Sequence, residues 1–261
     1  AVLSIDGPEY TALAEIAQRN AVFLAGSSYE ADPKFPGIFF QCAWVIDPTG
    51  KVVLRYRRLI STLVPSPHDV WDAYLDAYGL DGVFPVARTS IGNLAAIASE
   101  EILYPEIARC HAVRGAELFL HSSSEAYTVT APPKRIARLA RAMENLAWVI
   151  SANTAGIDNI DISIDSANGG SVIVDHLGNT VVAAGQGETM TANARIDLPG
   201  LREYRRRSGM GNLLSRLPYD AFQAGVAGLD IRRKNGLLKN GQVVVPARGY
   251  FREQQADSLA R

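Results

Sequence analysis

The first part of the chain shows apolar and polar positions in patterns that predict one helix, one buried strand and a hairpin. Apolar residues at helical spacing predict a helix over 10–19, and the apolar run at 21–26 predicts a buried strand. Two β-rich runs, 38–46 and 51–56, are joined by Asp-Pro-Thr-Gly, in which Pro and Gly occupy positions typical of a four-residue turn. This hairpin is followed by apolar residues at three- and four-residue steps, which predict an amphipathic helix over 65–79.

From residue 86 onward the pattern alternates between strand and helix. Strands are predicted over 91–98, 117–121 and 147–152, and helices over 105–114 and 134–146. A second hairpin is predicted over 171–184 and a last strand over 192–197. Because βαβ units and hairpins occur together, we expect an α/β fold with a mixed sheet.

Charge is unevenly distributed in the second half of the chain. The helix predicted over 134–146 has one basic face, which we expect to be solvated, formed by Lys134, Arg135, Arg138 and Arg141. After Pro199 the sequence contains four arginines and one glutamate within 202–207, followed by Gly, Pro and charge breaks. We therefore interpret 1–200 as one domain and 201–261 as an extension that packs on this domain or on a neighbouring subunit.

The composition narrows the classes of partner. The 26 Lys and Arg residues nearly balance the 27 Asp and Glu residues, so the net charge of −1 does not suggest a nucleic-acid partner. No apolar run is long enough to span a bilayer, and the N-terminus lacks the pattern of a signal peptide, so we expect no membrane partner and a cytoplasmic location. Two cysteines and four histidines predict neither a disulfide framework nor a closed zinc site.

Candidate chemistry lies where the strand over 91–98 ends. The chain leaves this strand through Ser99, Glu100 and Glu101 and enters a helix that begins with Tyr-Pro-Glu at 104–106. A side chain at such a strand-to-helix elbow projects into the crevice where open α/β sheets bind ligands. Ser99 occupies the elbow.

This stretch resembles the nitrilase, or carbon-nitrogen hydrolase, superfamily. The resemblance rests on Tyr-Pro-Glu-Ile-Ala-Arg at 104–109 and its Arg-Gly-Ala-Glu-Leu continuation, and segments within 50–59, 141–156 and 170–198 reinforce it in family order. The resemblance implies a four-layer αββα sandwich and hydrolysis of a small amide or nitrile without a cofactor or metal. It also implies a homodimer or higher homo-oligomer, for which the helix over 105–114 is our candidate contact.

Three positions depart from the catalytic glutamate, lysine and cysteine that the resemblance implies. The family cysteine falls on Ser99 and the family lysine on Arg58, while the glutamate belongs to a first βα unit that we expect to be missing before residue 1. A serine hydroxyl is much less acidic than a thiol, and an arginine keeps the positive charge but does not readily give up a proton. Cys42 and Cys110 do not replace the thiol, because free cysteines are more often packing residues.

Four interpretations of the site stay open. The favoured one is a diverged hydrolase in which Ser99 is the nucleophile and Arg58 an electrostatic clamp. The second is a catalytically inactive pseudoenzyme that acts as a binding or scaffolding protein, and the third is a cysteine-to-serine replacement in an active enzyme. The fourth is a divalent-metal site in which Glu100 and Glu101 combine with Asp69 or Asp72.

The residues expected to contact a substrate flank this elbow and the end of the next strand. They are Glu100, Glu101, His121, Ser123 and Glu125.

Overall fold

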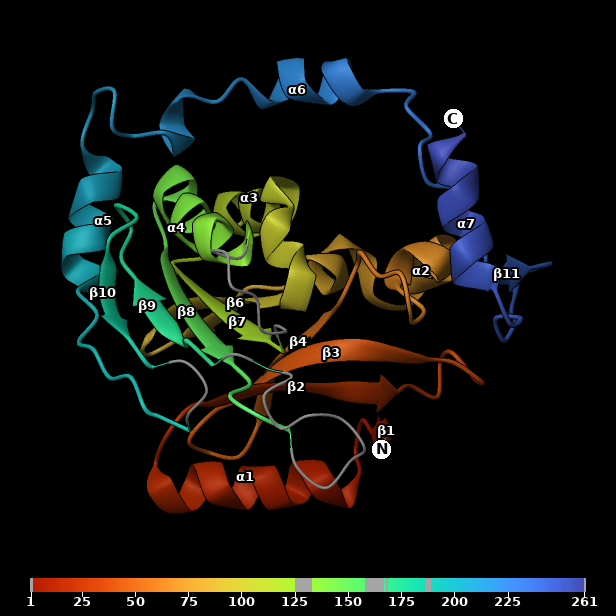
Figure 1. The fold of residues 1–261 in the computed structure, drawn as a ribbon, viewed down its shortest axis with the longest axis horizontal. Helices are drawn as coiled ribbons and strands as arrows, with labels where there is room; N and C mark the ends of the chain where they lie inside the picture. The colour runs from red at the N-terminus through yellow and green to blue at the C-terminus, as the bar shows by residue number, and fades with distance from the viewer. Residues whose placement is uncertain (1, 125–132, 158–166, 168, 186–188, 261) are drawn as a thin grey trace. The chain divides into compact units, whose positions relative to one another are not determined.

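The computed structural model describes residues 2–124, 133–157, 167, 169–185 and 189–260 (Figure 1). Contacts within the chain divide it into two compact units. Unit 1 consists of residues 1–85 and 218–261, and unit 2 of residues 86–217. The end of the chain therefore belongs to the unit that its beginning forms, and the predicted extension, 201–261, is divided between the two units.

Unit 1 is built on a four-stranded sheet of order β1-β2-β3-β4. Its strands are β1 (Val2–Ser4), β2 (Leu24–Ala31), β3 (Phe39–Ile46) and β4 (Val52–Arg57). β1 is parallel to β2, and the other two pairs are antiparallel. The predicted hairpin is confirmed. The strand predicted at 21–26 begins three residues later, because Ala21, at φ 52°, first ends the preceding helix, and it extends to Ala31.

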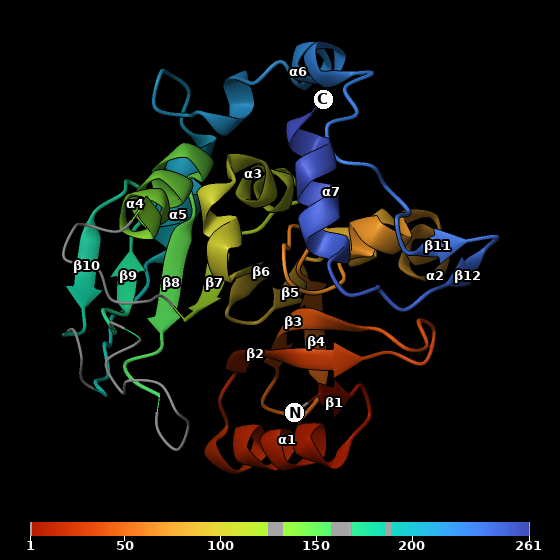
Figure 2. The ribbon, with the colours of Figure 1, turned by 45° about the vertical axis from the view of Figure 1, so that its right-hand side comes forward.

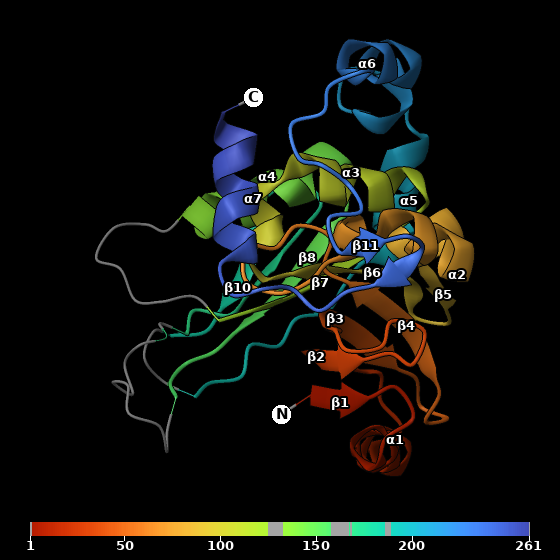
Figure 3. The ribbon, with the colours of Figure 1, turned by 90° about the vertical axis from the view of Figure 1, so that its right-hand side faces the viewer.

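Helix α1 (Pro8–Asn20) confirms the first predicted helix and lies beside β1 and β2, where Figure 3 shows it end-on. Trp44 and Ile46 of β3 pack against Tyr10 and Ala17 of this helix. Buried apolar contact of this kind supplies most of the stability of a short amphipathic helix. α1 therefore forms one apolar layer with the sheet of unit 1.

A second apolar cluster of unit 1 joins its two chain segments. A short 3₁₀ helix (Pro67–Val70) leads into α2 (Trp71–Val83), which contains a break at Gly79. Tyr74 of α2 packs in one buried cluster with Phe35, Phe40 and Leu237. The C-terminal segment also forms α6 (Tyr219–Val226), the two-residue strands β11 (Leu238–Lys239) and β12 (Gln242–Val243), and α7 (Tyr250–Leu259).

The carboxylate of Asp69 links these two segments by hydrogen bonds. Asp69 is fully buried and accepts from Ser66, whose hydroxyl lies 2.8 Å away. It also accepts from three side chains of the C-terminal segment: Arg232 at 3.3 Å, Tyr250 at 3.1 Å and Gln254 at 2.9 Å. We call this set the Asp69 cluster. A buried carboxylate that is supplied with this many donors is well compensated for its loss of water.

Unit 2 is built on a six-stranded sheet of order β10-β9-β8-β7-β6-β5. Its strands are β5 (Ala87–Thr89), β6 (Gly92–Ala98), β7 (Leu118–Ser123), β8 (Trp148–Asn153), β9 (Val172–Val174) and β10 (Thr180–Ala183). β6, β7 and β8 are parallel and the outer pairs are antiparallel, so the predicted mixed sheet is confirmed. Helices α3 (Pro105–Val113) and α4 (Pro133–Asn145) cover one face of this sheet (Figures 1 and 2).

One prediction for unit 2 is wrong and another holds only in part. Residues 192–197 form no strand. On the predicted basic face of α4, Arg135 is exposed and Lys134 half-buried, but Arg138 and Arg141 are only 4% and 8% exposed. The Arg141 guanidinium is buried because it donates to the carbonyls of Ile102, at 2.9 Å, and Leu103, at 3.1 Å. Those carbonyls follow the elbow, so this arginine ties α4 to the predicted site.

The arginine cluster of 202–207 lies partly in α5 (Leu198–Arg206) and makes contacts within unit 2. Arg202 forms two bonds to the Glu117 carboxylate, at 2.6 and 2.9 Å. Arg205 donates to the carbonyls of Leu146, at 2.8 Å, and Ala116, at 2.7 Å. These two arginines thus hold α5 against the ends of α4 and β7.

In the parts of the chain that the structure describes, no helix has the length and apolar character needed to cross a membrane.

Candidate functional site

The elbow predicted at the end of β6 is present and its backbone is strained. Ser99 follows Ala98, the last residue of β6, and begins a 3₁₀ helix (Ser99–Leu103) that leads into α3. Its φ of 52° lies in the left-handed region, which residues other than glycine rarely occupy. Such a conformation costs about 1–3 kcal/mol and persists where the surroundings hold it in place.

A buried carboxylate binds the backbone just before Ser99, and a buried guanidinium binds it a few residues later. Glu101 is fully buried, and its Oε2 accepts a long hydrogen bond, 3.4 Å, from the amide of Ala98. Arg141 binds the carbonyls that close the 3₁₀ helix. Glu101 therefore supports the elbow at the residue before Ser99, whereas its neighbour Glu100 is half-buried.

His121 of β7 contacts the elbow through the main chain. In the register of the sheet it lies between Ile97 of β6 and Ser151 of β8. Its Nε2 lies 2.8 Å from the carbonyl oxygen of Ser99, and its Nδ1 lies 2.8 Å from the hydroxyl oxygen of Ser151. Because a carbonyl can only accept, Nε2 carries the proton and Nδ1 accepts from Ser151.

The His121 ring is neutral in this environment. It is 1% exposed, and burial lowers its pKa from 6.5 to about 3. The hydrogen bond to the Ser99 carbonyl opposes this shift, and the nearby charges of Arg138 and Lys134 reinforce it. Both ring nitrogens form hydrogen bonds, and the bond to Ser99 is made to the carbonyl oxygen of that residue. The sequence therefore identified a residue that does lie beside Ser99, although the contact is to the backbone.

Arg58 follows the last residue of β4, in unit 1, and is half-buried. Its guanidinium donates to the carbonyl of Ile60, at 2.6 Å, and to the side-chain oxygen of Gln41, at 2.8 Å. Its backbone amide donates to the carbonyl of Gln41, at 2.9 Å. These contacts fix the cation firmly on the β3-β4 hairpin.

The other predicted site residues are spread over unit 2. Ser123, at the end of β7, accepts a hydrogen bond from Lys134 of α4 at 3.2 Å. Glu125 lies outside the described residues.

The alternative metal site finds no support in the described part of the chain, where no three histidine, cysteine or acidic side chains are grouped to hold an ion. Asp69, one of its proposed ligands, is engaged in the cluster described above.

The two cysteines differ in burial. Cys42 lies in β3 with no exposed surface, as expected of a packing residue, and burial strongly raises the pKa of its thiol. Cys110 of α3 is partly exposed, and burial likewise raises the pKa of its thiol. Neither environment produces the thiolate that nucleophilic catalysis requires.

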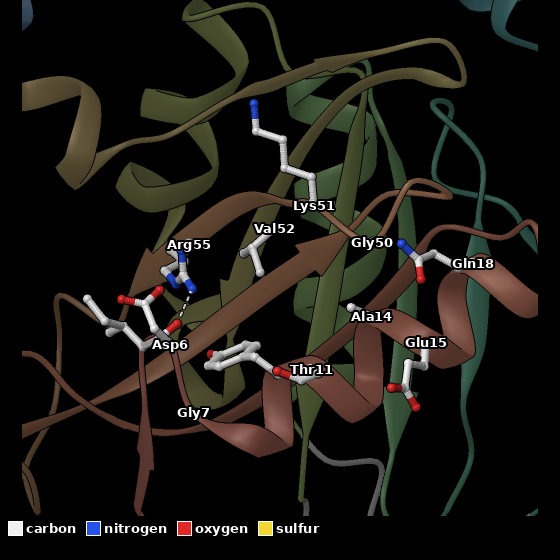
Figure 4. Close-up of a pocket in the computed structure, with 12 residues that line it drawn as sticks. Asp6, Gly7, Thr11, Ala14, Glu15, Gln18, Gly50, Lys51, Val52 and Arg55 are labelled. Atoms are coloured by element: carbon white, nitrogen blue, oxygen red, sulfur yellow. Dashed lines mark hydrogen bonds between the residues drawn. The ribbon is translucent and has the colours of Figure 1, made fainter.

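A cavity of about 610 Å³ in unit 1 contains none of the predicted site residues (Figure 4). Its walls come from the β1-α1 loop, α1, the hairpin turn and β4, and include Tyr10, Lys51 and Arg55. Arg55 donates to the carbonyl of Ile5 at 2.7 Å and to the carboxylate of Glu30 at 3.1 Å. The guanidinium in this hollow is therefore already occupied by bonds within unit 1.

A comparison with known protein families shows to which family the chain belongs. A family model described as carbon-nitrogen hydrolase matches residues 1–206. The chain belongs to the carbon-nitrogen hydrolase family. Among curated relatives of this family member, a formamidase of Pseudomonas syringae pv. tomato is 29% identical over 228 residues, which cover 85% of this chain and 61% of that protein. A formamidase of Bacillus thuringiensis is 28% identical over 158 residues, 60% of this chain and 44% of that protein.

Solved structures show that this carbon-nitrogen hydrolase family member has the predicted α/β fold. A carbon-nitrogen hydrolase from Helicobacter pylori G27 superposes with a TM-score of 0.65 at 22% identity, covering 84% of this chain and 76% of that one. Saccharomyces cerevisiae Nit3, a member of the nitrilase superfamily, gives a TM-score of 0.63 at 20% identity, with 78% and 71% covered. A mutant of the amidase from Nesterenkonia sp. AN1 in complex with butyramide gives 0.61 at 23% identity, with 83% and 72% covered.

The sequence did not indicate two residues that support the elbow. Ser151 is one, because only the register of β7 against β8 brings it to His121. Arg141 is the other, because a basic helix face is usually solvated. Its spacing to Glu144, three residues later, is a signal that it is held in place, and the two side chains are 2.6 Å apart.

Proposed function

We propose that this carbon-nitrogen hydrolase family member hydrolyses small aliphatic amides of the formamide and butyramide class, with Ser99 as the nucleophile. The observation that carries the proposal is the strained and braced elbow at Ser99, since a left-handed residue between a strand and a helix presents its side chain outward. The family membership and the formamidase relatives favour the substrate class, although the chain spans less than two thirds of those relatives' length.

In the proposed reaction the Ser99 oxygen forms a bond to the amide carbon and its proton passes to the departing nitrogen. The carbon-nitrogen bond then breaks and ammonia leaves, after which water hydrolyses the ester to release the carboxylic acid and restore the hydroxyl. The proposal gives Arg58 the task of stabilising the negative charge that develops on the amide oxygen. This role follows from its match to the family's lysine position and from the donor geometry of a guanidinium.

The proposal is tested by ammonia release from formamide and butyramide in the full chain and in two variants. Ser99→Ala should lower the rate at least about 100-fold, because the attacking oxygen is removed. Ser99→Cys should retain or raise activity, because a thiol is a better nucleophile near neutral pH. An acyl adduct on the Ser99 peptide after exposure to an activated ester would support the same role, and a Ser99→Ala rate equal to wild type would overturn it.

A non-catalytic binding protein of the same family is the second candidate. The observation that favours it is that His121, the imidazole beside Ser99, binds the carbonyl of this residue and is held neutral. A serine nucleophile normally has a histidine or lysine base on its hydroxyl. No ammonia release from wild type, no adduct on Ser99 and no gain in Ser99→Cys would together select this second candidate.

A further inference from the structure

We propose that His121 is a positioning residue that fixes the orientation of Ser99 by holding the Ser99 carbonyl, and that it does not contact substrate. The inference rests on the proposed role of Ser99 and deepens it. It replaces substrate contact, which the sequence predicted for this histidine, with action through the main chain.

The first argument is the location of the bond. A backbone with φ of 52° needs contacts that prevent its return to a common conformation. The Nε2 proton of His121 is donated to the carbonyl of this residue at 2.8 Å, in a buried setting where a hydrogen bond is stronger than in water. Rotation of the peptide after Ser99 would break the bond and leave a buried donor unpaired.

The second argument is that the ring itself is held. Ser151 donates to Nδ1 at 2.8 Å, which selects the tautomer that carries its proton on Nε2. His121 and Ser151 are paired neighbours on adjacent parallel strands, so the sheet register sets their separation. The support thus runs from β8 through β7 to the residue that follows β6.

The third argument concerns charge around the ring. Two cations of α4, Arg138 and Lys134, act on His121 and oppose a second proton. Lys134 is itself bound to Ser123 of the same strand, at 3.2 Å. In the neutral ring the Nε2 proton is aimed at the carbonyl and the Nδ1 lone pair accepts from Ser151, which suits a support and leaves neither nitrogen aimed at the Ser99 hydroxyl as a general base would be.

The kinetic experiment compares two replacements of His121 in the full chain. His121→Gln keeps an amide donor near the position of Nε2, whereas His121→Leu removes it. We expect His121→Leu to lower kcat for formamide about 10- to 100-fold with KM changed less than about threefold, and His121→Gln to restore kcat to within about threefold of wild type. His111→Gln, at an equally buried histidine of α3, is the matched control and should leave kcat unchanged.

The structural experiment is independent of activity. Nitrogen NMR of histidine-labelled protein should show His121 neutral, with the proton on Nε2, at neutral pH, and Ser151→Ala should shift its Nδ1 signal. The Ser99 amide signal should move in His121→Leu and return toward its wild-type position in His121→Gln. A proton on Nδ1, a charged ring, or a Ser99 signal that ignores both variants would overturn the inference.

The two experiments separate the two proposals. If wild type releases no ammonia but the NMR result is as expected, the proposed hydrolysis fails and the support of the elbow stands. If Ser99→Ala abolishes activity while His121→Leu keeps the wild-type kcat and Ser99 signal, the hydrolysis stands and the positioning role is wrong.

Discussion

The Arg57 cluster of unit 1 and the Ser99 carbonyl of unit 2 are held by different chemistry. In unit 1, the nearly buried Arg57 places one guanidinium nitrogen 2.9 Å from Glu30 and 2.8 Å from Asp32. Tyr10 donates to Glu30 at 2.8 Å, and Tyr78 donates to Asp32. Charges joined in this way must all be kept, because each one compensates the desolvation of another.

At the elbow of unit 2, by contrast, the described contact to the Ser99 carbonyl comes from a neutral group. His121 is uncharged, and its other partner is the hydroxyl of Ser151. Neutral hydrogen bonds fix geometry without imposing a strong local field. The comparison teaches that ionic bonds hold the strands of unit 1 together, whereas the Ser99 carbonyl is held by an uncharged donor even though the charged Glu101 and Arg141 bind the backbone next to it.

The largest expected effect comes from breaking the ionic cluster. Arg57→Met should destabilise the protein by about 3–5 kcal/mol, because Glu30 and Asp32 would stay buried without their shared cation. The free energy of unfolding in urea measures the loss. Arg57→Lys is the control that keeps the charge and should lose less. A loss below about 1 kcal/mol in the Met variant would show that solvent or another group takes over the role.

Lowering the pH is expected to have an intermediate effect on the stability of the folded protein, through protonation of His121. Its pKa is about 3 in the folded protein and 6.5 in an ordinary environment, so on acidification the unfolded chain takes up the proton first. The stability contribution is fully present above about pH 6.5 and is lost as pH falls toward 3, reaching a loss on the order of 3 kcal/mol near pH 4.5. The measurement is the difference in unfolding free energy between wild type and His121→Gln across this range. Parallel pH curves for the two proteins would contradict the buried neutral ring.

The smallest effect is expected at an exposed ion pair. Arg207 and Glu203 lie one helical turn apart at 3.3 Å, and both side chains are about two thirds exposed. Glu203→Ala should change the unfolding free energy by less than about 0.5 kcal/mol, because water and salt screen such a pair. Thermal unfolding at low and high salt is a sufficient measurement. A change as large as that of Arg57→Met would mean that exposure does not govern the worth of charge pairs in this chain.

The sequence predicted the elements whose pattern is local. The hairpin at β3 and β4 was found because its turn residues act locally: the Asp47 carboxylate accepts from the amides of Thr49, at 2.8 Å, and Lys51, at 3.1 Å. Ser99 was found for the same reason, as the residue between an apolar strand and a Tyr-Pro-Glu helix start. Local signals of this kind need no knowledge of the tertiary structure.

What the sequence did not predict depends on pairing between distant segments. Arg141 was assigned to solvent because its partners, the carbonyls of Ile102 and Leu103, lie 38 or more residues away. The strand predicted over 192–197 is absent, since strand formation depends on a neighbour with which to pair and Ile196 is the one strong strand former in this segment. β1 was not predicted because a strand of three residues is too short to show a recognisable alternation of apolar and polar positions.

The Asp69 cluster has a consequence for a chain that is cut. α6, which precedes Arg232, buries none of its residues, whereas Arg232, Tyr250 and Gln254 all bind one fully buried carboxylate. A protease that severs the backbone between α6 and Arg232 would remove the covalent link but none of these bonds. The released tail would therefore stay seated on unit 1, and the nicked protein would migrate as one species until a denaturant separates its two fragments.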